Sequence, residues 1–241
     1  MITFIVGQMR SGTSLLKEIL NANSKIVIPP NDYSFLDYEG TIEDKLEEWN
    51  IESANNPKDI IDNFYKNHPK NTIRVVKRPG YEFRLEEIEK YYDEFKLIYM
   101  LRDPRAIALS RKYYDGNPLW DSIPNEDLYT MMGHWMYSYQ VLSKLKFYSH
   151  VFPLKYERLV TQPEECVRLL CDFLEVDYDE NMLTSFDTES LNSSVETKNH
   201  NKIYTDMIDK WKTKLDSEEI KYINSLVGKK LLLYEGYDIY E

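Results

Sequence analysis

The chain has 241 residues, of which 42% are hydrophobic, and it carries a formal net charge of −11 at pH 7. This length and apolar content suffice for a substantial core, and we expect residues 1–241 to form a single α/β domain. The acidic balance argues against a nucleic-acid partner or general affinity for anionic membranes, because such binding draws on an excess of lysine and arginine. An anionic ligand must therefore be held by a local cluster of basic groups.

The small number of cysteines and the lack of a long apolar run further restrict the class of protein. Only two cysteines occur, Cys166 and Cys171, and their spacing fits neither a zinc site nor a disulfide framework, so we expect apolar helix residues in a reducing compartment. The N-terminus lacks a basic segment before its short apolar run, and no stretch approaches the roughly 20 apolar residues that span a bilayer. The sequence therefore favours a soluble, cytoplasmic protein without a cleaved signal or a membrane span.

The first elements of the chain predict a parallel sheet. The run Ile2–Val6 is β-branched or aromatic and is closed by Gly7, which is typical of a strand buried on both faces. A helical apolar pattern follows over 13–20, and a second short strand over 25–28 is stopped by two prolines. Strand, loop, helix and strand in this order form a βαβ unit, in which the two strands run parallel.

The rest of the chain continues to alternate between helices and strands. Apolar periodicity predicts helices over 42–49, 58–65, 85–92, 103–113, 125–149 and 163–174. Short apolar runs predict further strands over 72–76, 96–101 and 151–156. The stretch 187–201 is rich in Ser, Thr and Asn and is the best candidate for a mobile loop.

The loop after the first strand has the spacing of a phosphate-binding loop. The segment Gly7-Gln8-Met9-Arg10-Ser11-Gly12-Thr13-Ser14 fits G-x-x-x-x-G-K-[ST], except that Thr13 stands where the lysine would be. Such a turn points backbone N–H groups into one concavity, where the helix N-terminus adds partial positive charge. Arg10 adds a planar fork that can grip a phosphate or sulfate. We expect a site for one compact anionic group; the alternative is a tight turn with a solvated arginine.

A second anion motif follows the fourth predicted strand, in "LIYMLRDPRAIALS". Arg102 lies at the carboxyl end of this strand, and Ser110 lies two turns along the next helix. Ligands bind at the carboxyl ends of strands in parallel sheets, so both side chains can address the same ligand as the first loop. The alternative is an arginine that pairs with Asp103 beside a small helical serine.

The two motifs together resemble the signature segments of PAPS-dependent sulfotransferases of the bacterial and Golgi-like type, which bind 3'-phosphoadenosine 5'-phosphosulfate (PAPS). The segments that carry the resemblance are "RSGTSLL" and "YMLRDPRAIALS". It extends to "PLKYERLVTQPEECVRLLCDFLEV" and to "DKWKTKLDSEE" near 209–219. The resemblance implies a P-loop-type three-layer α/β fold with a central parallel sheet flanked by helices.

The resemblance also assigns roles to matching positions. The first loop would hold the 5'-phosphosulfate through Arg10, Ser11, Gly12, Thr13 and Ser14, and the 3'-phosphate would be held by Arg102 and Ser110. Tyr156 matches a tyrosine that lies near the adenine. PAPS would be the co-substrate and adenosine 3',5'-bisphosphate (PAP) the product. PAPS has no β- or γ-phosphate chain, so the resemblance accounts for the absent lysine and implies that no metal is required.

Catalysis of sulfuryl transfer needs positive charge at the transferring group and a base for the acceptor proton. Arg10 is our candidate for the charge, and Lys77 matches a lysine that approaches the sulfate in relatives; its alternative role is that of a solvated strand-end lysine. Cytosolic members place a histidine where this chain has Pro79. Other members use a carboxylate after the second strand, where this chain offers Asp32, Asp37 and Glu39. The resemblance thus points to Asp32 as the base, with Asp37 behind it, and helix capping is the alternative role of Asp32.

The sequence thus predicts a sulfotransferase that moves a sulfuryl group from PAPS to a hydroxyl or amine. The acceptor partner is expected to be a small molecule, carbohydrate, lipid or peptide. Two alternatives stay open at this point: a small-molecule P-loop kinase, and a non-catalytic nucleotide-binding module on the same fold. The identity of the acceptor, the catalytic base and the oligomeric state are not determined by the sequence.

Overall fold

A parallel sheet forms the centre of the protein. The structure is a computed structural model, and it describes residues 1–29, 57–114, 117–118, 125–184, 205 and 207–239. The strand order in the five-stranded sheet is β2-β3-β1-β4-β7. Its strands are β1 (Ile2–Gly7), β2 (Ile26–Val27), β3 (Ile73–Lys77), β4 (Phe95–Leu101) and β7 (Val151–Lys155). All four pairings are parallel, so the predicted sheet is confirmed.

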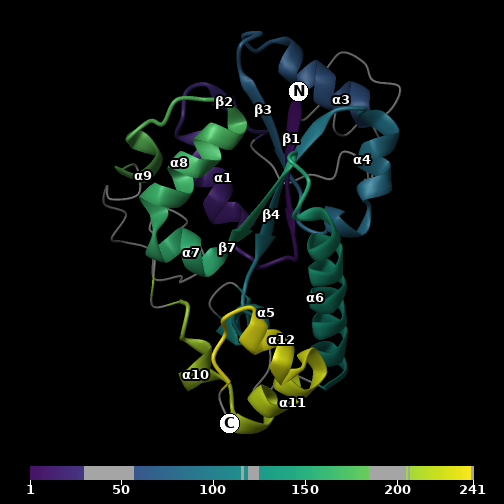
Figure 1. The fold of residues 1–241 in the computed structure, drawn as a ribbon, viewed down its shortest axis with the longest axis vertical. Helices are drawn as coiled ribbons and strands as arrows, with labels where there is room; N and C mark the ends of the chain where they lie inside the picture. Colours follow the sequence, from purple (N-terminus) through teal and green to yellow (C-terminus); the bar gives the residue numbers. More distant parts are fainter. Residues whose placement is uncertain (30–56, 115–116, 119–124, 185–204, 206, 240–241) are drawn as a thin grey trace.

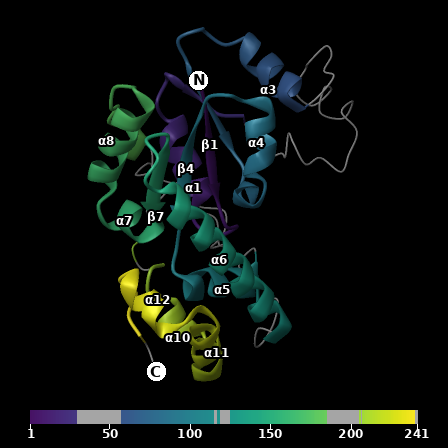
Figure 2. The ribbon, with the colours of Figure 1, turned by 45° about the vertical axis from the view of Figure 1, so that its right-hand side comes forward.

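Helices cover both faces of this sheet (Figure 1). One face is covered by α1 (Thr13–Asn21), α7 (Tyr156–Thr161), α8 (Pro163–Leu174) and α9 (Asn181–Thr184). The other face is covered by α3 (Pro57–Lys66), α4 (Leu85–Tyr91) and α6 (Asn125–Leu145). Figure 2 shows from a second direction that α1 and α8 lie across the sheet from α4. This arrangement is the expected three-layer α/β fold.

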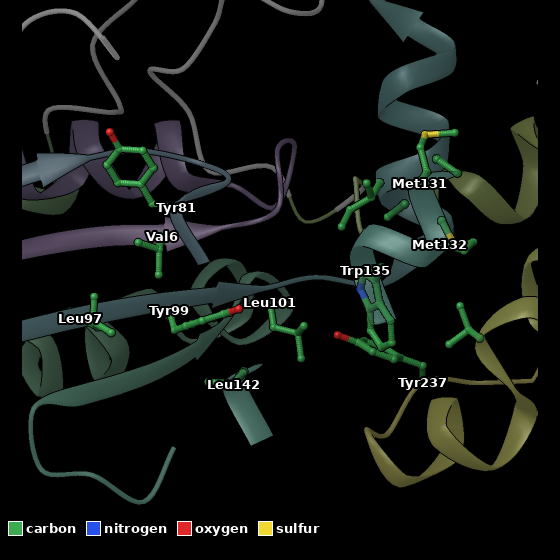
Figure 3. Close-up of a cluster of buried hydrophobic side chains, with 14 of the residues drawn as sticks. Val6, Tyr81, Leu97, Tyr99, Leu101, Met131, Met132, Trp135, Leu142 and Tyr237 are labelled. Atoms are coloured by element: carbon green, nitrogen blue, oxygen red, sulfur yellow. The ribbon is translucent and has the colours of Figure 1, made fainter. Parts of the chain in front are cut away.

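The two faces follow from alternation along the buried strands. In β1, Phe4 and Val6 belong to the hydrophobic cluster under α4 and α6, whereas Ile5 belongs to the cluster under α1 and α8. In β4, Tyr99 belongs to the first of these clusters and Ile98 to the second. Side chains of a strand alternate between faces, so a strand with helices on both sides must be apolar throughout. Figure 3 shows part of the first cluster, in which α6 contributes Trp135.

A group of helices lies beyond the carboxyl ends of the strands, at the lower end of the molecule in Figures 1 and 2. It comprises α5 (Pro104–Lys112), α10 (Trp211–Lys214), α11 (Ser217–Val227) and α12 (Lys229–Tyr234). A buried ion pair of 3.0 Å joins Lys112 of α5 to Glu219 of α11. The Arg105 guanidinium lies 3.9 Å from the centre of the Trp211 ring. These contacts fix the C-terminal helices beside the edge of the sheet where ligands bind in parallel folds.

Short connecting elements complete the described chain. A 3-10 helix, η1 (Tyr81–Phe83), connects β3 to α4. A two-residue antiparallel ladder joins β5 (Tyr113–Tyr114) to β6 (Asn117–Pro118) after α5. Within the described ranges, no helix combines the length and the apolar content that crossing a bilayer requires.

Most predicted boundaries lie within one residue of the observed ones, and two of the differences change the path of the chain before and after β7. The helix expected over 125–149 ends at Leu145, because the chain turns toward β7 through hydrogen bonds from the Tyr148 amide to Leu145 and from the Val151 amide to Tyr148. The strand expected over 151–156 ends at Lys155, and Tyr156 begins α7 instead. The helix predicted over 42–49 and the loop predicted over 187–201 lie outside the described residues.

The two cysteines lie in α8, as predicted for apolar helix residues. Both are buried, and neither forms a disulfide. The thiol of Cys171 is 3.7 Å from the Met182 sulfur, and burial raises its pKa to about 11. This side chain therefore contributes to packing between α8 and α9.

Candidate functional site

The first loop is built on two glycines that no other residue could replace without strain. Gly7 has φ 136°, and a Cβ there would lie 2.4 Å from the Met100 carbonyl oxygen of β4. Gly12 has φ 97°, and a Cβ there would lie 2.4 Å from Cδ2 of the Tyr156 ring. Glycine adopts positive φ freely and permits close approach, so the loop lies directly against β4 and Tyr156. The glycines of the pattern therefore bring the two anion motifs together.

The N-terminus of α1 opens into this loop without a side-chain cap. Its N-cap residue is Gly12, and its first turn carries no acidic residue. The first N–H groups of a helix have no intrahelical partner and favour an anion. Ser11 is fully buried, and its Oγ has no hydrogen-bond partner among the described residues. A buried hydroxyl left without a partner is costly, so these features fit a bound phosphate or sulfate group.

Arg10 connects the loop to the second motif. Its φ of 74° places a non-glycine residue in the left-handed region, which costs on the order of 1 to 3 kcal/mol and is found mainly at functional sites. Its Nε donates to Ser110 Oγ at 2.9 Å, and its carbonyl accepts from Arg102 Nη1 at 3.1 Å. The structure thus brings together the predicted residues Arg10, Arg102 and Ser110.

Arg102 is held over an aromatic ring at the end of β4. Its guanidinium carbon lies 4.0 Å from the centre of the Tyr156 ring, where a cation and a ring attract each other. Its Nη2 donates to the Met207 carbonyl at 3.2 Å, while Nε is buried without a partner among the described residues. Arg102 does not pair with Asp103, the alternative considered above, because Asp103 forms its ion pair with Arg105, at 2.7 Å. Arg102 therefore presents its fork beside the first loop.

The second motif is supported by Asp103 and by several residues that the sequence analysis did not single out. Asp103 caps α5 by accepting from the Arg105 amide, and the Arg105 side chain, fully buried, also donates to the Asp238 carbonyl at 2.6 Å. Trp135 Nε1 donates to the Arg102 carbonyl at 2.8 Å. Glu157 Oε1 accepts from the Asp103 amide at 2.8 Å, and burial raises the pKa of this carboxyl. The turn at Arg102 is thus fixed from three directions.

Lys77 reaches the first loop from the end of β3. Its side chain is buried, with 4% exposed, and its Nζ donates to Ser14 Oγ at 2.8 Å. Burial excludes the alternative of a solvated strand-end lysine. A lysine beside the first turn of α1 adds positive charge to the region that the loop amides define.

Glu82 is a second carboxylate that the sequence analysis missed. It is 1% exposed, and its Oε2 accepts from the Gly7 amide at 3.1 Å. Burial raises its pKa to about 7. Its position in η1, behind the loop rather than within either motif, left no local pattern by which to find it.

The remaining predicted site residues divide into two groups. Thr13 is buried in the first turn of α1, and Tyr156 lies between Gly12 and Arg102. Asp32 and Asp37 lie outside the described residues, so the predicted base has no structural description.

The chain belongs to the sulfotransferase family. The model of that family matches residues 3–180. The chain is 25% identical over 284 residues to the nodulation protein NoeE of Sinorhizobium fredii, and the match covers 99% of this chain and 66% of that protein. It is 24% identical to an uncharacterized protein of Aquifex aeolicus, and the match covers 96% of this chain and 35% of that protein. The chain therefore spans just under two thirds of the length of NoeE and about one third of the length of the Aquifex aeolicus protein.

Solved structures share the fold at low sequence identity. The sulfotransferase domain from the curacin biosynthetic pathway has a TM-score of 0.68 at 21% identity, covering 99% of this chain and 98% of that one. The sulfotransferase domain of the Synechococcus PCC 7002 olefin synthase has a TM-score of 0.64 at 20% identity, with 94% of each chain covered. A mouse sulfotransferase complexed with PAP has a TM-score of 0.62 at 16% identity, covering 98% and 88%. These similarities show the P-loop-type sulfotransferase fold.

Proposed function

We propose that this chain transfers a sulfuryl group from PAPS to a hydroxyl or amine of an acceptor. Family membership supports sulfuryl transfer in general. One observation supports the donor: Arg10 of the first loop, Arg102 after β4 and Ser110 of α5 meet in hydrogen bonds of 2.9 and 3.1 Å. Two positive side chains and an uncapped helix N-terminus in one place suit a ligand with two separate anionic groups.

Among the described residues, two of the buried polar atoms without hydrogen-bond partners suit the two ends of this donor. Ser11 Oγ and the uncapped N-terminus of α1 suit the 5'-phosphosulfate, and Arg102 Nε, with Ser110, suits the 3'-phosphate. In this proposal Tyr156, against which Gly12 packs, lies beside the adenine. Arg10 contacts Ser110 and lies between the two predicted phosphate positions, so it can respond to either group.

The reaction requires a bond to form between the acceptor atom and sulfur while the bond between sulfur and the 5'-phosphate oxygen breaks, which leaves PAP. In this proposal Arg10 and Lys77 stabilise the negative charge that develops on the leaving oxygen. Asp32 takes the acceptor proton. The loop amides orient the donor for in-line attack.

Titration with PAP by calorimetry tests the donor assignment. Wild-type protein should bind PAP, and Arg102→Ala should weaken binding by about 100-fold or more, because hydrogen bonds to charged groups each contribute about 1.5 to 3 kcal/mol. Arg168→Ala is the matched control, because Arg168 is an exposed arginine of α8 that pairs with Glu164. The assignment fails if wild type does not bind PAP, or if both variants bind it equally well.

Turnover of PAPS with mixtures of acceptors tests the catalytic step. Alcohols, amines, sugars, lipids and tyrosine peptides should be offered separately, so that the productive class identifies the acceptor. Asp32→Asn should abolish PAP release while leaving PAP affinity unchanged. Binding of PAP without turnover on any acceptor would support the non-catalytic module instead, and magnesium-dependent binding of ATP with indifference to the 3'-phosphate would support the kinase.

A further inference from the structure

The end of β1 is completed by a side chain rather than by a strand. The Arg78 amide donates to the Ile5 carbonyl and the Gly80 amide to the Gly7 carbonyl, so the parallel ladder with β3 extends to Gly7 on its carbonyl side. In a continued ladder the Gly7 amide would donate to the Arg78 carbonyl. It donates instead to Glu82 Oε2, at 3.1 Å. Glu82 therefore takes the place of a backbone acceptor at the first residue of the anion loop.

The Glu82 carboxyl is enclosed by neutral groups. The groups that act most on it are the backbone amides of Gly7, Gly80 and Glu82 itself and the hydroxyl of Ser138 on α6. Burial raises the pKa of the Tyr99 phenol on β4, and the charge of the nearby Glu82 raises it further. The Tyr99 hydroxyl donates to the Ser138 carbonyl at 2.7 Å. Glu82 Oε1 is buried and has no hydrogen-bond partner among the described residues. Among the described residues no cation lies against this buried carboxylate, which disfavours its charged form.

The position of Gly7 connects this carboxyl to the ligand side of the loop. A Cβ at Gly7 would lie 3.1 Å from Ser11 Oγ, the buried hydroxyl that has no partner among the described residues. A single backbone amide therefore separates the Glu82 carboxyl from the floor of the predicted 5' site. Any change in charge or position at Glu82 acts on the loop at close range.

We propose that Glu82 is a positioning residue whose protonation sets the charge behind the anion loop and so couples donor affinity to pH. The proposal rests on the proposed function for the identity of the ligand. When Glu82 is protonated, it holds the Gly7 amide without adding charge behind the loop. When it ionises, a negative charge faces the back of a site that must receive an anion, and affinity for the donor falls.

The direction of the pKa supports this coupling in the physiological range. Burial raises the pKa of Glu82 from 4.5 to about 7, so the neutral form dominates below pH 7 and the charged form above it. By linkage, a bound anion favours the neutral form and raises this pKa further. Binding of PAP near pH 7 should therefore be accompanied by proton uptake at Glu82.

The first measurement needs no ligand. The chain contains eight glycines, so selective labelling with ¹⁵N-glycine gives at most eight amide signals. Labelling valine with ¹³C at the carbonyl marks the Gly7 and Gly228 signals, which follow Val6 and Val227, and Gly228→Ala removes the second. The Gly7 signal should titrate with a midpoint near pH 7 in wild type and in the surface control Glu86→Gln, and it should not titrate in Glu82→Gln.

The second measurement uses PAP at pH 6 and pH 8. Because the phosphates of PAP also titrate, the informative quantity is the ratio of wild-type Kd to Glu82→Gln Kd, in which the ligand's own titration cancels. This ratio should rise about three- to tenfold between the two pH values, as expected for a charge a few ångströms behind the site. The corresponding ratio for Glu86→Gln should not change.

The two readouts separate the possible failures. A Gly7 amide that does not titrate near pH 7 in wild type overturns the role of Glu82, and this test holds even if Glu82→Gln does not fold. A titrating Gly7 amide with a constant Kd ratio overturns the coupling to the donor. If wild type binds no PAP at any pH, the proposed function fails together with the coupling, while the amide titration still decides whether Glu82 controls the loop.

Discussion

The two anion-binding turns of this protein both follow a buried strand, yet they are held in different ways. The loop after β1 is held at Gly7 by two hydrogen bonds and by no ion pair. The Gly7 amide donates to Glu82, and the Gly7 carbonyl accepts from the Gly80 amide. The turn after β4 is held by a buried ion pair between Asp103 and Arg105 and by the C-terminal segment, which Arg105 reaches at Asp238. The first turn should therefore be sensitive to pH, and the second to the removal of a charge.

Removal of Arg105 should produce the largest change in stability. Arg105→Leu leaves Asp103 buried and unpaired, and breaking a buried pair by deleting one partner costs about 3 to 5 kcal/mol. Urea unfolding followed by circular dichroism measures the loss. Arg168→Leu, which removes an exposed partner of Glu164, should cost only about 0 to 1 kcal/mol. Equal losses in the two variants would show that the second turn does not depend on this pair.

The pH dependence of stability should reveal the carboxyl behind the first turn. Because the pKa of Glu82 in the folded protein is raised to about 7, its contribution to stability is fully present below pH 4.5 and is lost as pH rises to about 7. Between pH 5 and pH 8 the unfolding free energy of wild type should fall by about 2 to 3 kcal/mol relative to that of Glu82→Gln. Parallel pH profiles for the two proteins would contradict this.

Gly12→Ala tests the contact between the two turns. The new Cβ would need left-handed φ and would meet the Tyr156 ring, which is not a flexible chain end, so we expect a loss of about 2 kcal/mol in unfolding free energy. Gly236→Ala is the control, because Gly236 also has positive φ but its Cβ would meet nothing within 4 Å. It should cost about 1 kcal/mol, from backbone strain alone. A smaller loss at Gly12 than at Gly236 would mean that the loop yields without displacing Tyr156.

Ser110→Ala should give the smallest of these effects. It removes the acceptor of the Arg10 Nε hydrogen bond and one predicted partner of the 3'-phosphate, so PAP affinity should fall about fivefold. Calorimetric titration measures the change. Ser225→Ala, at an exposed position of α11, should leave PAP affinity unaltered. An unchanged affinity in Ser110→Ala would remove this residue from the donor site.

The two turns also differ in how far the sequence predicts them. The first is encoded locally: two glycines, a flanking strand and a following helix are enough to expect an anion loop, and its lysine-free pattern already restricts the ligand. The parallel sheet could be predicted for the same reason, because each buried strand is an apolar run bounded by turn residues.

The supports of both turns could not be predicted, because they are contacts across the fold. Arg105 meets Asp238, 133 positions later, and Glu157 meets the Asp103 amide over 54 positions. Glu82 lies 75 positions from Gly7, and nothing in its neighbourhood distinguishes it from a surface glutamate. Pairing of Arg102 with the adjacent Asp103 was a reasonable local alternative, but Arg105 binds Asp103 through both its backbone and its side chain.

The central claim is that the two turns bind two different anionic groups of one nucleotide. The affinities of wild type and Arg102→Ala for PAP and for adenosine 5'-phosphate, which lacks the 3'-phosphate, test it most directly. We predict that wild type binds PAP at least about 100-fold more tightly than adenosine 5'-phosphate. In Arg102→Ala this preference should shrink to about fivefold or less, because only Ser110 is left for the 3'-phosphate. Equal affinity of wild type for both nucleotides, or an undiminished preference for PAP in Arg102→Ala, would contradict the account.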